Sequence, residues 1–222
     1  MRRLILNLHG IGTPGRSLET GDAPYWVSET LYRDTVALAA KLRNQVDIRF
    51  TFDDGNASDL EIGAEALSEH GFVGTFFVLS SRIDQPGSLS AADLLQLQKM
   101  GHQIGSHGAD HVDWTALDAA GQKREFSTAR QRLSEITGST VDQAAIPFGR
   151  YNRRVLQALK QDGFQGIYSS DKGDWHPRHC PTPRTSLTED MTIETITRML
   201  TQPDALKVRL KRRLSMAIKK RI

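Results

Sequence analysis

The apolar run at residues 46–52 ends in two adjacent carboxylates, Asp53 and Asp54, which are followed by Gly55. A short apolar run of this kind is typical of a strand. Neighbouring carboxylates repel each other and raise each other's pKa, so a cation normally accompanies such a pair. The pair therefore predicts a cation site at the end of a strand.

Two histidines spaced four residues apart, His107 and His111, offer the further ligands that a cation site needs. Side chains at this spacing can direct both imidazoles to one point. With Asp54 they would form a set of one oxygen and two nitrogen ligands, which leaves a position for water as in hydrolytic zinc sites. Asp53 would then serve as the general base on that water, or alternatively as another metal ligand. Zinc is the expected divalent ion, with cobalt, nickel or iron as alternatives.

Three motifs follow one another along the chain: Thr51-Phe52-Asp53-Asp54-Gly55, His107-x-x-x-His111 and Pro147-Phe148-Gly149-Arg150-Tyr151-Asn152. Together they resemble the motifs of the polysaccharide deacetylases, carbohydrate esterase family four, over roughly residues 1–185. The resemblance implies an α/β fold, a distorted (β/α) barrel of about seven strands. It also implies metal-dependent removal of acetyl groups, mostly from N-acetylated sugars, with the backbone N–H of Phe148 stabilising the oxyanion.

The chain departs from the family pattern at three places. Gly108 stands where the family has Ser or Thr after the first histidine, and Ala145 stands where it has the arginine that orients the base. No histidine follows His179, so the C-terminal motif that supplies the family's general acid is absent. Arg184, in a later predicted strand, is the candidate for the missing guanidinium. The alternative for Arg184 is an arginine in a surface ion pair.

The general acid is expected at the other end of the chain. Residues 4–8 form a strand pattern that closes on His9 and Gly10. This pattern resembles the N-terminal strand of the circularly permuted poly-N-acetylglucosamine deacetylase branch. The first and last strands of a barrel are neighbours, so moving one strand from the end to the start preserves the site. His9 is therefore the candidate acid, and its alternative is a histidine that caps a turn.

Aromatic side chains near the predicted strand ends are candidates for a platform on which sugar rings stack. The candidate substrate-binding residues are Trp114, Tyr151 and Trp175, joined by Pro147 of the third motif, with Trp26 and Phe148 as further aromatic candidates. Aromatic residues at strand ends are also ordinary parts of a core. Core packing is therefore the alternative for each of them.

Composition agrees with one catalytic domain. The chain has 222 residues with 38% hydrophobic side chains, and its strand-type and helix-type segments alternate as a (β/α) fold requires. We predict a barrel domain at residues 1–204 and a basic tail at residues 205–222. Cys180 is the only cysteine, and residues 1–9 are too short an apolar stretch for a signal peptide. The chain is accordingly expected to be cytoplasmic, peripheral to the inner face of the membrane.

The tail carries a separate signal. An apolar residue recurs every fourth position, at Leu206, Leu210, Leu214, Ile218 and Ile222, beside eight Lys or Arg residues and no acid. A basic amphipathic helix of this kind suits an anionic membrane surface. The first alternative is a terminal helix that packs its stripe on the barrel. The second, less favoured, is a nucleic acid or another acidic partner.

The function expected from these residues is a metal-dependent N-deacetylase of N-acetylated sugars. The basic tail suggests a lipid-linked or nucleotide-linked polysaccharide precursor as the substrate. One alternative is an acetyl-ester (O-) deacetylase on the same fold. The other is a catalytically impaired carbohydrate-binding module, suggested by the absent arginine at Ala145 and the absent C-terminal histidine. The sequence specifies neither the sugar nor the oligomeric state.

Overall fold

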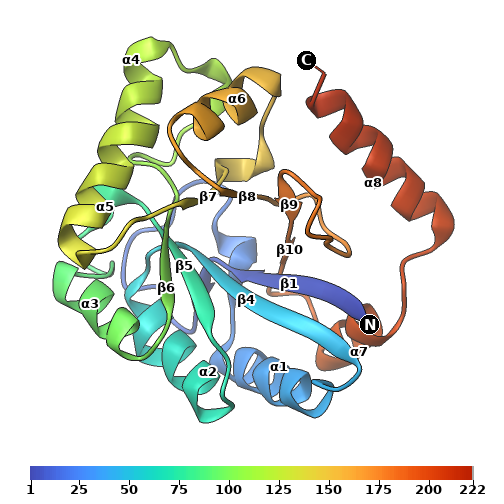
Figure 1. Ribbon diagram of the computed structural model, residues 1–222. Coiled ribbons are helices and arrows are strands. Elements are labelled where there is room, and N and C mark those ends of the chain that lie inside the picture. The colour runs from blue at the N-terminus through green and yellow to red at the C-terminus, as the bar shows by residue number, and fades with distance from the viewer. Residues whose placement is uncertain (222) are drawn as a thin grey trace.

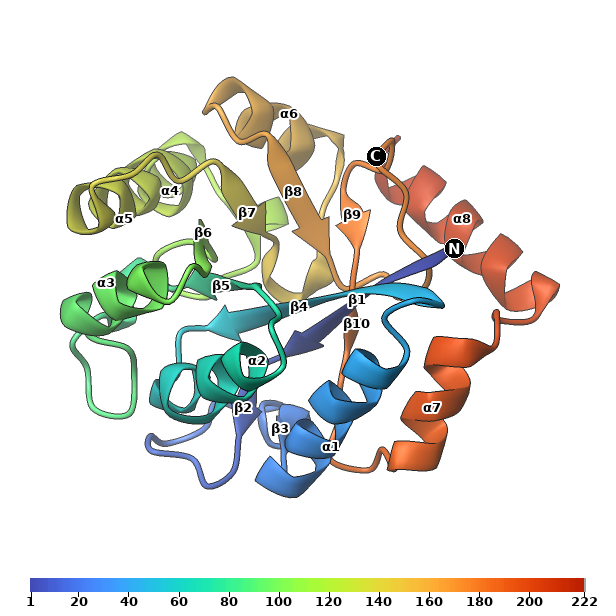
Figure 2. The same ribbon diagram turned by 60° about the horizontal axis from the view of Figure 1, so that its bottom comes forward.

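A computed structural model describes residues 1–221 of the protein. Ile222, the last member of the predicted apolar stripe, lies outside the described residues. The fold is built on eight parallel strand segments in the order β10-β1-β4-β5-β6-β7-β8-β9 (Figures 1 and 2). Their bounds are β1 Arg2–Leu8, β4 Val46–Asp54, β5 Gly74–Val78, β6 Gln103–Ser106, β7 Gln143–Ala145, β8 Gly166–Ser169, β9 Thr182–Pro183 and β10 Thr185–Ser186.

The sheet closes almost completely on itself. Its two edge segments, β9 and β10, are separated along the chain by a single residue, Arg184. Tyr168 of β8 is in register with Thr182 on one side of this segment, and Leu6 of β1 is in register with Thr185 on the other. Residues 182–186 therefore form the last strand of the barrel, between β8 and β1. The expected distorted (β/α) barrel of about seven strands is confirmed.

Helices surround the barrel on its outside (Figure 1). They are α1 Glu29–Lys41, α2 Glu65–Glu69, α3 Ala91–Lys99, α4 Ala119–Gln122, α5 Ala129–Thr137, α6 Arg153–Gln161, α7 Ile193–Thr201 and α8 Leu206–Lys219. π-Helical turns at Asp59–Ala64 and Lys123–Thr128 lead into α2 and α5. A separate pair of two-residue strands, β2 Gly10–Ile11 and β3 Trp26–Val27, brackets the loop at residues 12–25.

The apolar core has two parts. The larger part packs the strands β1, β4 and β5 against α1, α2 and α3, with Phe52 and Phe76 stacked at 4.4 Å between ring centroids. The smaller part lies beneath α6 and includes Trp114, Phe126 and Tyr151. Trp114 and Tyr151 are only 1% and 4% exposed. Their predicted role as a sugar platform is therefore wrong, because core packing leaves their rings out of reach of a ligand.

The tail forms a helix, α8, that runs along the outside of the barrel (Figure 2). None of its residues is fully buried. Among residues 1–221, no helix has the length and apolar character that a bilayer crossing requires. The division into domains at residues 204 and 205 stays a prediction.

Candidate metal and catalytic site

The candidate site lies where the parallel strands end, which is where barrel enzymes place their chemistry. A pocket of about 210 Å³ opens there. Its walls come from the ends of β1, β4, β6, β8 and β10, from the turn after β7 and from the loop after β2. The lining residues are His9, Thr20, Gly21, Asp22, Tyr25, Asp53, His107, His111, Phe148, Ser170 and Ser186.

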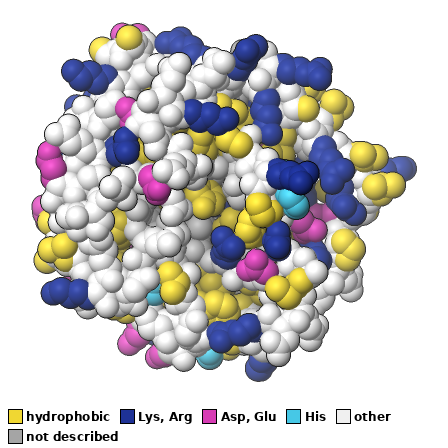
Figure 3. Space-filling view, viewed as in Figure 1, with side chains coloured by type: hydrophobic (Ala, Val, Ile, Leu, Met, Phe, Trp, Pro, Cys, Tyr) yellow, Lys and Arg dark blue, Asp and Glu magenta, His cyan; other side chains and the backbone are white. Residues whose placement is uncertain are grey.

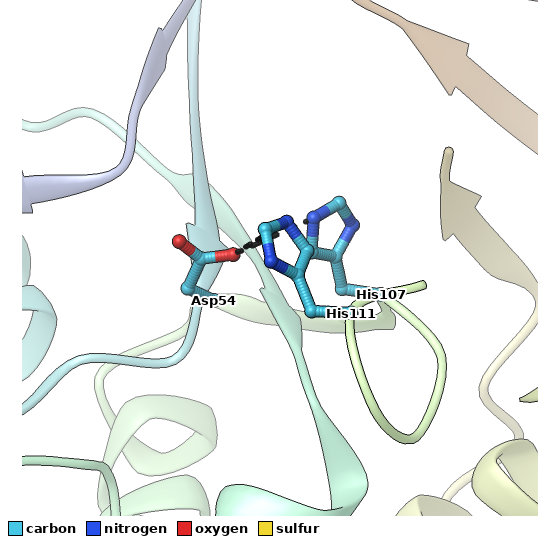
Figure 4. A group of neighbouring side chains, drawn as sticks. All are labelled: Asp54, His107 and His111. Atoms are coloured by element: carbon cyan, nitrogen blue, oxygen red, sulfur yellow. Dashed lines mark ion pairs between the residues drawn. The ribbon is translucent and has the colours of Figure 1, made fainter. Parts of the chain in front are cut away.

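Asp54, His107 and His111 converge beside this pocket (Figure 4). The Oδ1 atom of Asp54 lies 3.5 Å from Nε2 of His107 and 3.7 Å from Nε2 of His111. One ligand atom from each residue lies within 4.8 Å of the other two. Asp54 and His111 both have positive φ, at 78° and 55°. Such backbone strain is typical of functional sites, where the surrounding structure holds a side chain in a required direction.

Both imidazoles are oriented by their other nitrogen. Nδ1 of His107 lies 2.8 Å from the carbonyl oxygen of Ala145, and Nδ1 of His111 lies 3.0 Å from Oε2 of Glu19. When each Nδ1 carries the proton, each Nε2 has a free lone pair that faces Asp54, as in metal-ligating histidines. Burial lowers the pKa of His107 to about 4, so its imidazole is neutral at neutral pH, the form that binds a metal.

The donor set fits a divalent cation. Oδ1 of Asp54 is buried and has no hydrogen-bond partner within residues 1–221. A buried acceptor left without a partner costs about 1–3 kcal/mol, and more when it is charged. A cation between Oδ1 and the two Nε2 atoms would remove that cost. One carboxylate and two imidazoles are a ligand set that catalytic zinc sites use, with positions left for water and substrate.

Asp53 points into the barrel, where it meets Arg184. The guanidinium donates from Nη1 to Oδ1 and from Nη2 to Oδ2 of Asp53, each at 2.7 Å. Asn7 donates a further hydrogen bond to Oδ2 at 2.9 Å. Burial raises the pKa of Asp53, but the Arg184 guanidinium together with the nearby imidazoles of His107 and His9 outweighs burial and holds that pKa well below its usual range. The carboxylate is therefore ionised, fixed in direction and already engaged, which leaves Asp54 as the carboxylate free for a metal.

Arg184 is wholly buried, at 0% exposure, so the alternative of a surface ion pair is wrong. Its Nη1 atom also donates to Oδ1 of Asn7 at 2.7 Å and to Oγ1 of Thr51 at 3.2 Å. Asn7 and Thr51 are in register on the paired strands β1 and β4. The guanidinium expected in the third motif, at Ala145, is thus supplied to Asp53 by Arg184, from the segment between β9 and β10.

His9 follows β1 and lines the same pocket as Asp53. Its Nε2 atom lies 3.7 Å from Oδ2 of Asp53, and its ring centroid lies 4.9 Å from that of Tyr25. Its Nδ1 atom is buried without a hydrogen-bond partner among the described residues. The structure thus brings His9 to the end of the barrel that holds the candidate metal site, directly after the strand that pairs with β10 next to Arg184.

The loop between the two histidines depends on glycine at position 108. Gly108 has φ of 92°, and a Cβ added there would lie 2.3 Å from Oε2 of Glu125. That buried carboxylate accepts hydrogen bonds from the backbone N–H of Ala109 at 2.8 Å and of Asp110 at 3.2 Å. Trp114 donates from Nε1 to Oε2 of Glu125 at 3.4 Å. The departure from the family's Ser or Thr is therefore explained, because Glu125 takes the space of that side chain.

The third motif forms a tight turn at the rim of the pocket. Phe148 has φ of 56°, is 53% exposed, and has its ring centroid 4.5 Å from that of His111. Pro147 and Gly149 are buried, so in this turn only Phe148 offers a surface to a ligand. Tyr151 turns inward and donates to Oδ2 of Asp171 at 2.8 Å.

Two tryptophans are placed away from the pocket. Trp175 lies beside Arg3 and Arg49, whose guanidinium carbons are 5.4 and 4.2 Å from its ring centroid. Arg3 is at the start of β1 and His9 follows its end, on the order of 20 Å away at the usual rise of a strand. The predicted contact of Trp175 with a sugar in the site is therefore wrong. Trp26 packs its ring on Gly10, whose lack of a side chain makes room for it.

Several residues that shape the site were not predicted. Asn7 could have been found, because it is a buried amide inside the apolar strand Arg2–Leu8 and points to the same face as His9. Glu19 and Arg16 come from the loop after β2. Arg16 Nη2 lies 3.8 Å from Oδ2 of Asp54 and Arg16 Nε donates to Oδ1 of Asn56 at 2.8 Å. No sequence pattern signals the contacts of this loop.

Comparison with known proteins gives the family. The family model described as polysaccharide deacetylase matches residues 42–167, which is more than half of the chain. The chain belongs to the polysaccharide deacetylase family. It is 33% identical over 138 residues to the chitooligosaccharide deacetylase of Azorhizobium caulinodans, which covers 60% of this chain and 63% of that protein. It is 29% identical over 140 residues to the peptidoglycan-N-acetylglucosamine deacetylase PgdA of Listeria monocytogenes, covering 63% of this chain and 29% of that protein.

Solved structures show the same fold. The Streptococcus pyogenes deacetylase PplD, in complex with acetate, matches with a TM-score of 0.78 at 17% identity. The match covers 90% of this chain and 98% of that one. The chain spans less than two thirds of the curated relatives described above. The predicted relation to the circularly permuted branch of the family stays a prediction.

Proposed function

We propose that the protein is a metal-dependent deacetylase that removes the acetyl group from N-acetylated sugars. The observation that supports this most directly is the buried Oδ1 of Asp54, which has no hydrogen-bond partner among the described residues and faces two imidazoles held by their Nδ1 atoms. The ligands are proposed to be Asp54, His107 and His111, and the metal to be zinc. Such an ion would lower the pKa of a water molecule and polarise the acetyl carbonyl.

The remaining chemistry falls to residues around the pocket. Asp53 would accept the proton of the attacking water as general base, with Arg184 and Asn7 fixing the direction of its oxygens. His9 would protonate the leaving amine. The backbone N–H of Phe148 would donate a hydrogen bond to the oxyanion as it forms. The products would be acetate and a free amino sugar.

The exposed ring of Phe148 lies against His111, and the ring of Tyr25, which is 38% exposed, lies against His9. Both rings offer apolar faces to a ligand, and sugar C–H groups stack on such faces. We infer that these two residues, and not the predicted tryptophans, contact the sugar. A lipid-linked or nucleotide-linked precursor is the substrate that we propose. The cytoplasmic location stays a prediction.

One experiment tests the metal and the reaction together. The purified protein is analysed for metal and then incubated with N-acetylglucosamine oligomers, and released acetate is measured. His111→Ala should contain much less metal and release no acetate above background. The matched control is His176→Ala, which removes an exposed histidine outside the pocket. Normal metal content in His111→Ala would show that the site is not built as proposed.

The two alternatives give different results in the same assay. An acetyl-ester deacetylase would release acetate from acetylated xylan faster than from the N-acetylglucosamine oligomers. A carbohydrate-binding module would retain the oligomers without releasing acetate, whether or not metal is bound. The intact set of Asp53, Asp54, His107 and His111 argues against the second alternative.

A further inference from the structure

The helix α8 holds its apolar stripe away from the barrel. Leu206, Leu210, Leu214 and Ile218 are between 50% and 66% exposed, although they recur every four residues as a core-facing stripe does. Soluble proteins rarely leave a row of large apolar side chains uncovered unless it serves as a contact surface. The alternative expectation, that this stripe packs on the barrel, is contradicted for these four residues.

Polar contacts on the opposite side of the helix fix this orientation. Lys219 donates to the carbonyl oxygen of Gly149 at 3.1 Å and forms an ion pair with Asp171 at 2.7 Å. Arg212 pairs with Asp204 and lies against Gly173. At about 100° per residue, Arg212 and Lys219 lie on the side of the helix opposite to the stripe. The helix is therefore held to the barrel by Arg212 and Lys219, and its apolar side faces the solvent.

The remaining basic residues border the stripe. Lys207 and Lys211 flank it on one side, and Arg209 and Arg213 flank it on the other. Together with Lys220 and Arg221, they have no ion-pair partner within the described chain, residues 1–221. Figure 3 shows apolar side chains standing out at the edge of the molecule over α8, with Lys and Arg side chains beside them.

We propose that α8 docks on the surface of an anionic lipid bilayer, with the stripe inserted at the headgroup boundary and the basic residues among the lipid phosphates. Insertion and charge attraction reinforce each other in such helices. A nucleic acid would use the charges but not the leucines, because its backbone is bound by Lys and Arg. A second copy of the chain would bring two equally basic helices together, which their repulsion opposes.

The docked position would bring the pocket to the membrane. The C-terminal end of α8 is tied to Gly149, which follows the pocket residue Phe148 directly in the chain. A helix lying on the bilayer would thus hold the pocket rim beside the lipid headgroups. This surface does not depend on the proposed reaction, since none of the candidate ligands or catalytic residues belongs to α8.

The test is sedimentation of the 222-residue protein with vesicles. One set is made of phosphatidylcholine alone, and the other contains phosphatidylglycerol and phosphatidylcholine. We expect binding to the anionic vesicles and little to the neutral ones. The charge variant Lys207→Gln/Lys211→Gln/Arg213→Gln should bind on the order of 100-fold more weakly, as expected for three basic residues at such a surface. The stripe variant Leu210→Ser/Leu214→Ser should weaken binding by roughly the same factor.

The control variant is Lys99→Gln/Lys123→Gln/Lys160→Gln, which removes the same charge from exposed positions on other helices and should bind as the wild type does. Circular dichroism of each variant checks that the fold is retained. Equal binding to both kinds of vesicle would overturn the proposal. So would a stripe variant that binds normally while the charge variant loses binding, because a polyanion would then explain the surface. Concentration-dependent self-association that the stripe variant abolishes, without vesicle binding, would point to a second copy instead.

Discussion

Arg184 and Asp53 are joined by two hydrogen bonds of 2.7 Å although 131 residues separate them in the chain. Both are almost fully buried, at 0% and 1% exposure. A bidentate pair of this kind fixes a carboxylate in position and keeps it ionised. Ala145, which occupies the place of the family's arginine, instead accepts a hydrogen bond from His107 through its backbone. Arg184 therefore gives Asp53 the guanidinium contact that the side chain of Ala145 cannot supply.

Breaking this pair on one side should destabilise the fold. Arg184→Met leaves the Asp53 charge buried without its partner, and such losses cost about 3–5 kcal/mol. The double variant Arg184→Met/Asp53→Asn removes both charges and should recover most of that free energy of unfolding. Urea denaturation of the single and double variants measures it. If the double variant is less stable than Arg184→Met by a further independent amount, the two residues do not act as a pair.

Asp53→Asn should separate base chemistry from metal binding. The amide keeps the size of the side chain but cannot accept a proton, so acetate release should fall on the order of 10²–10⁴-fold. Metal content should stay at the wild-type level, because Asp54 is the carboxylate that faces the imidazoles. Asp47→Asn on the same strand is the matched control. Loss of metal in Asp53→Asn would instead support the alternative of Asp53 as a metal ligand.

His9→Gln should affect amides and activated esters differently. Departure of an amine requires a proton, so release of acetate from an N-acetylated sugar should fall on the order of 10²–10⁴-fold. Nitrophenyl acetate has a leaving group that departs without a proton, and its hydrolysis should change by less than about tenfold. Tyr25→Phe, which keeps the ring beside His9, should preserve the ratio of the two rates. An equal loss on both substrates would mean that His9 only supports the pocket.

Glu19→Gln should weaken metal binding without removing a ligand. The amide can still accept a hydrogen bond from Nδ1 of His111, but it no longer carries the charge that makes the imidazole a better donor to a metal. Changes of this kind typically cost 10–100-fold in metal affinity. Zinc titration in competition with a chelator measures it, with the exposed Glu61→Gln as control. Unchanged affinity would remove Glu19 from the metal site.

The barrel and the convergence of the candidate ligands could be predicted because their signals are local. The apolar run before Asp53 identifies a strand, and the spacing of His107 and His111 needs no knowledge of the rest of the fold. Arg184 could be named as a candidate only because Ala145 left a role unfilled. Its burial and its partner depend on closure of the sheet, which no short segment encodes.

The failures have a physical cause as well. The sequence around a tryptophan that stacks on a sugar does not differ from the sequence around one that fills a core. Only the tertiary fold distinguishes the two roles. Trp114 lies in the core and Trp175 lies at the far end of β1 for that reason. Glu19 reaches His111 across 92 residues of chain. The helix α7 at Ile193–Thr201 was not predicted, although Thr192 caps it and Ile196 and Leu200 face the core.

The single residue between β9 and β10 links assembly of the site to the order of synthesis. Asp53, Asp54 and both histidines leave the ribosome well before Arg184, because the chain emerges from its N-terminus. Until Arg184 has been synthesised, the barrel lacks the last strand segment that closes it, and Asp53 lacks its counterion. A nascent chain, or a fragment that ends before β9, would carry all three candidate metal ligands but not the guanidinium that orients Asp53. In the proposed mechanism such a chain would bind an ion without hydrolysing the substrate, because the proposed base gains its partner only when the barrel is complete.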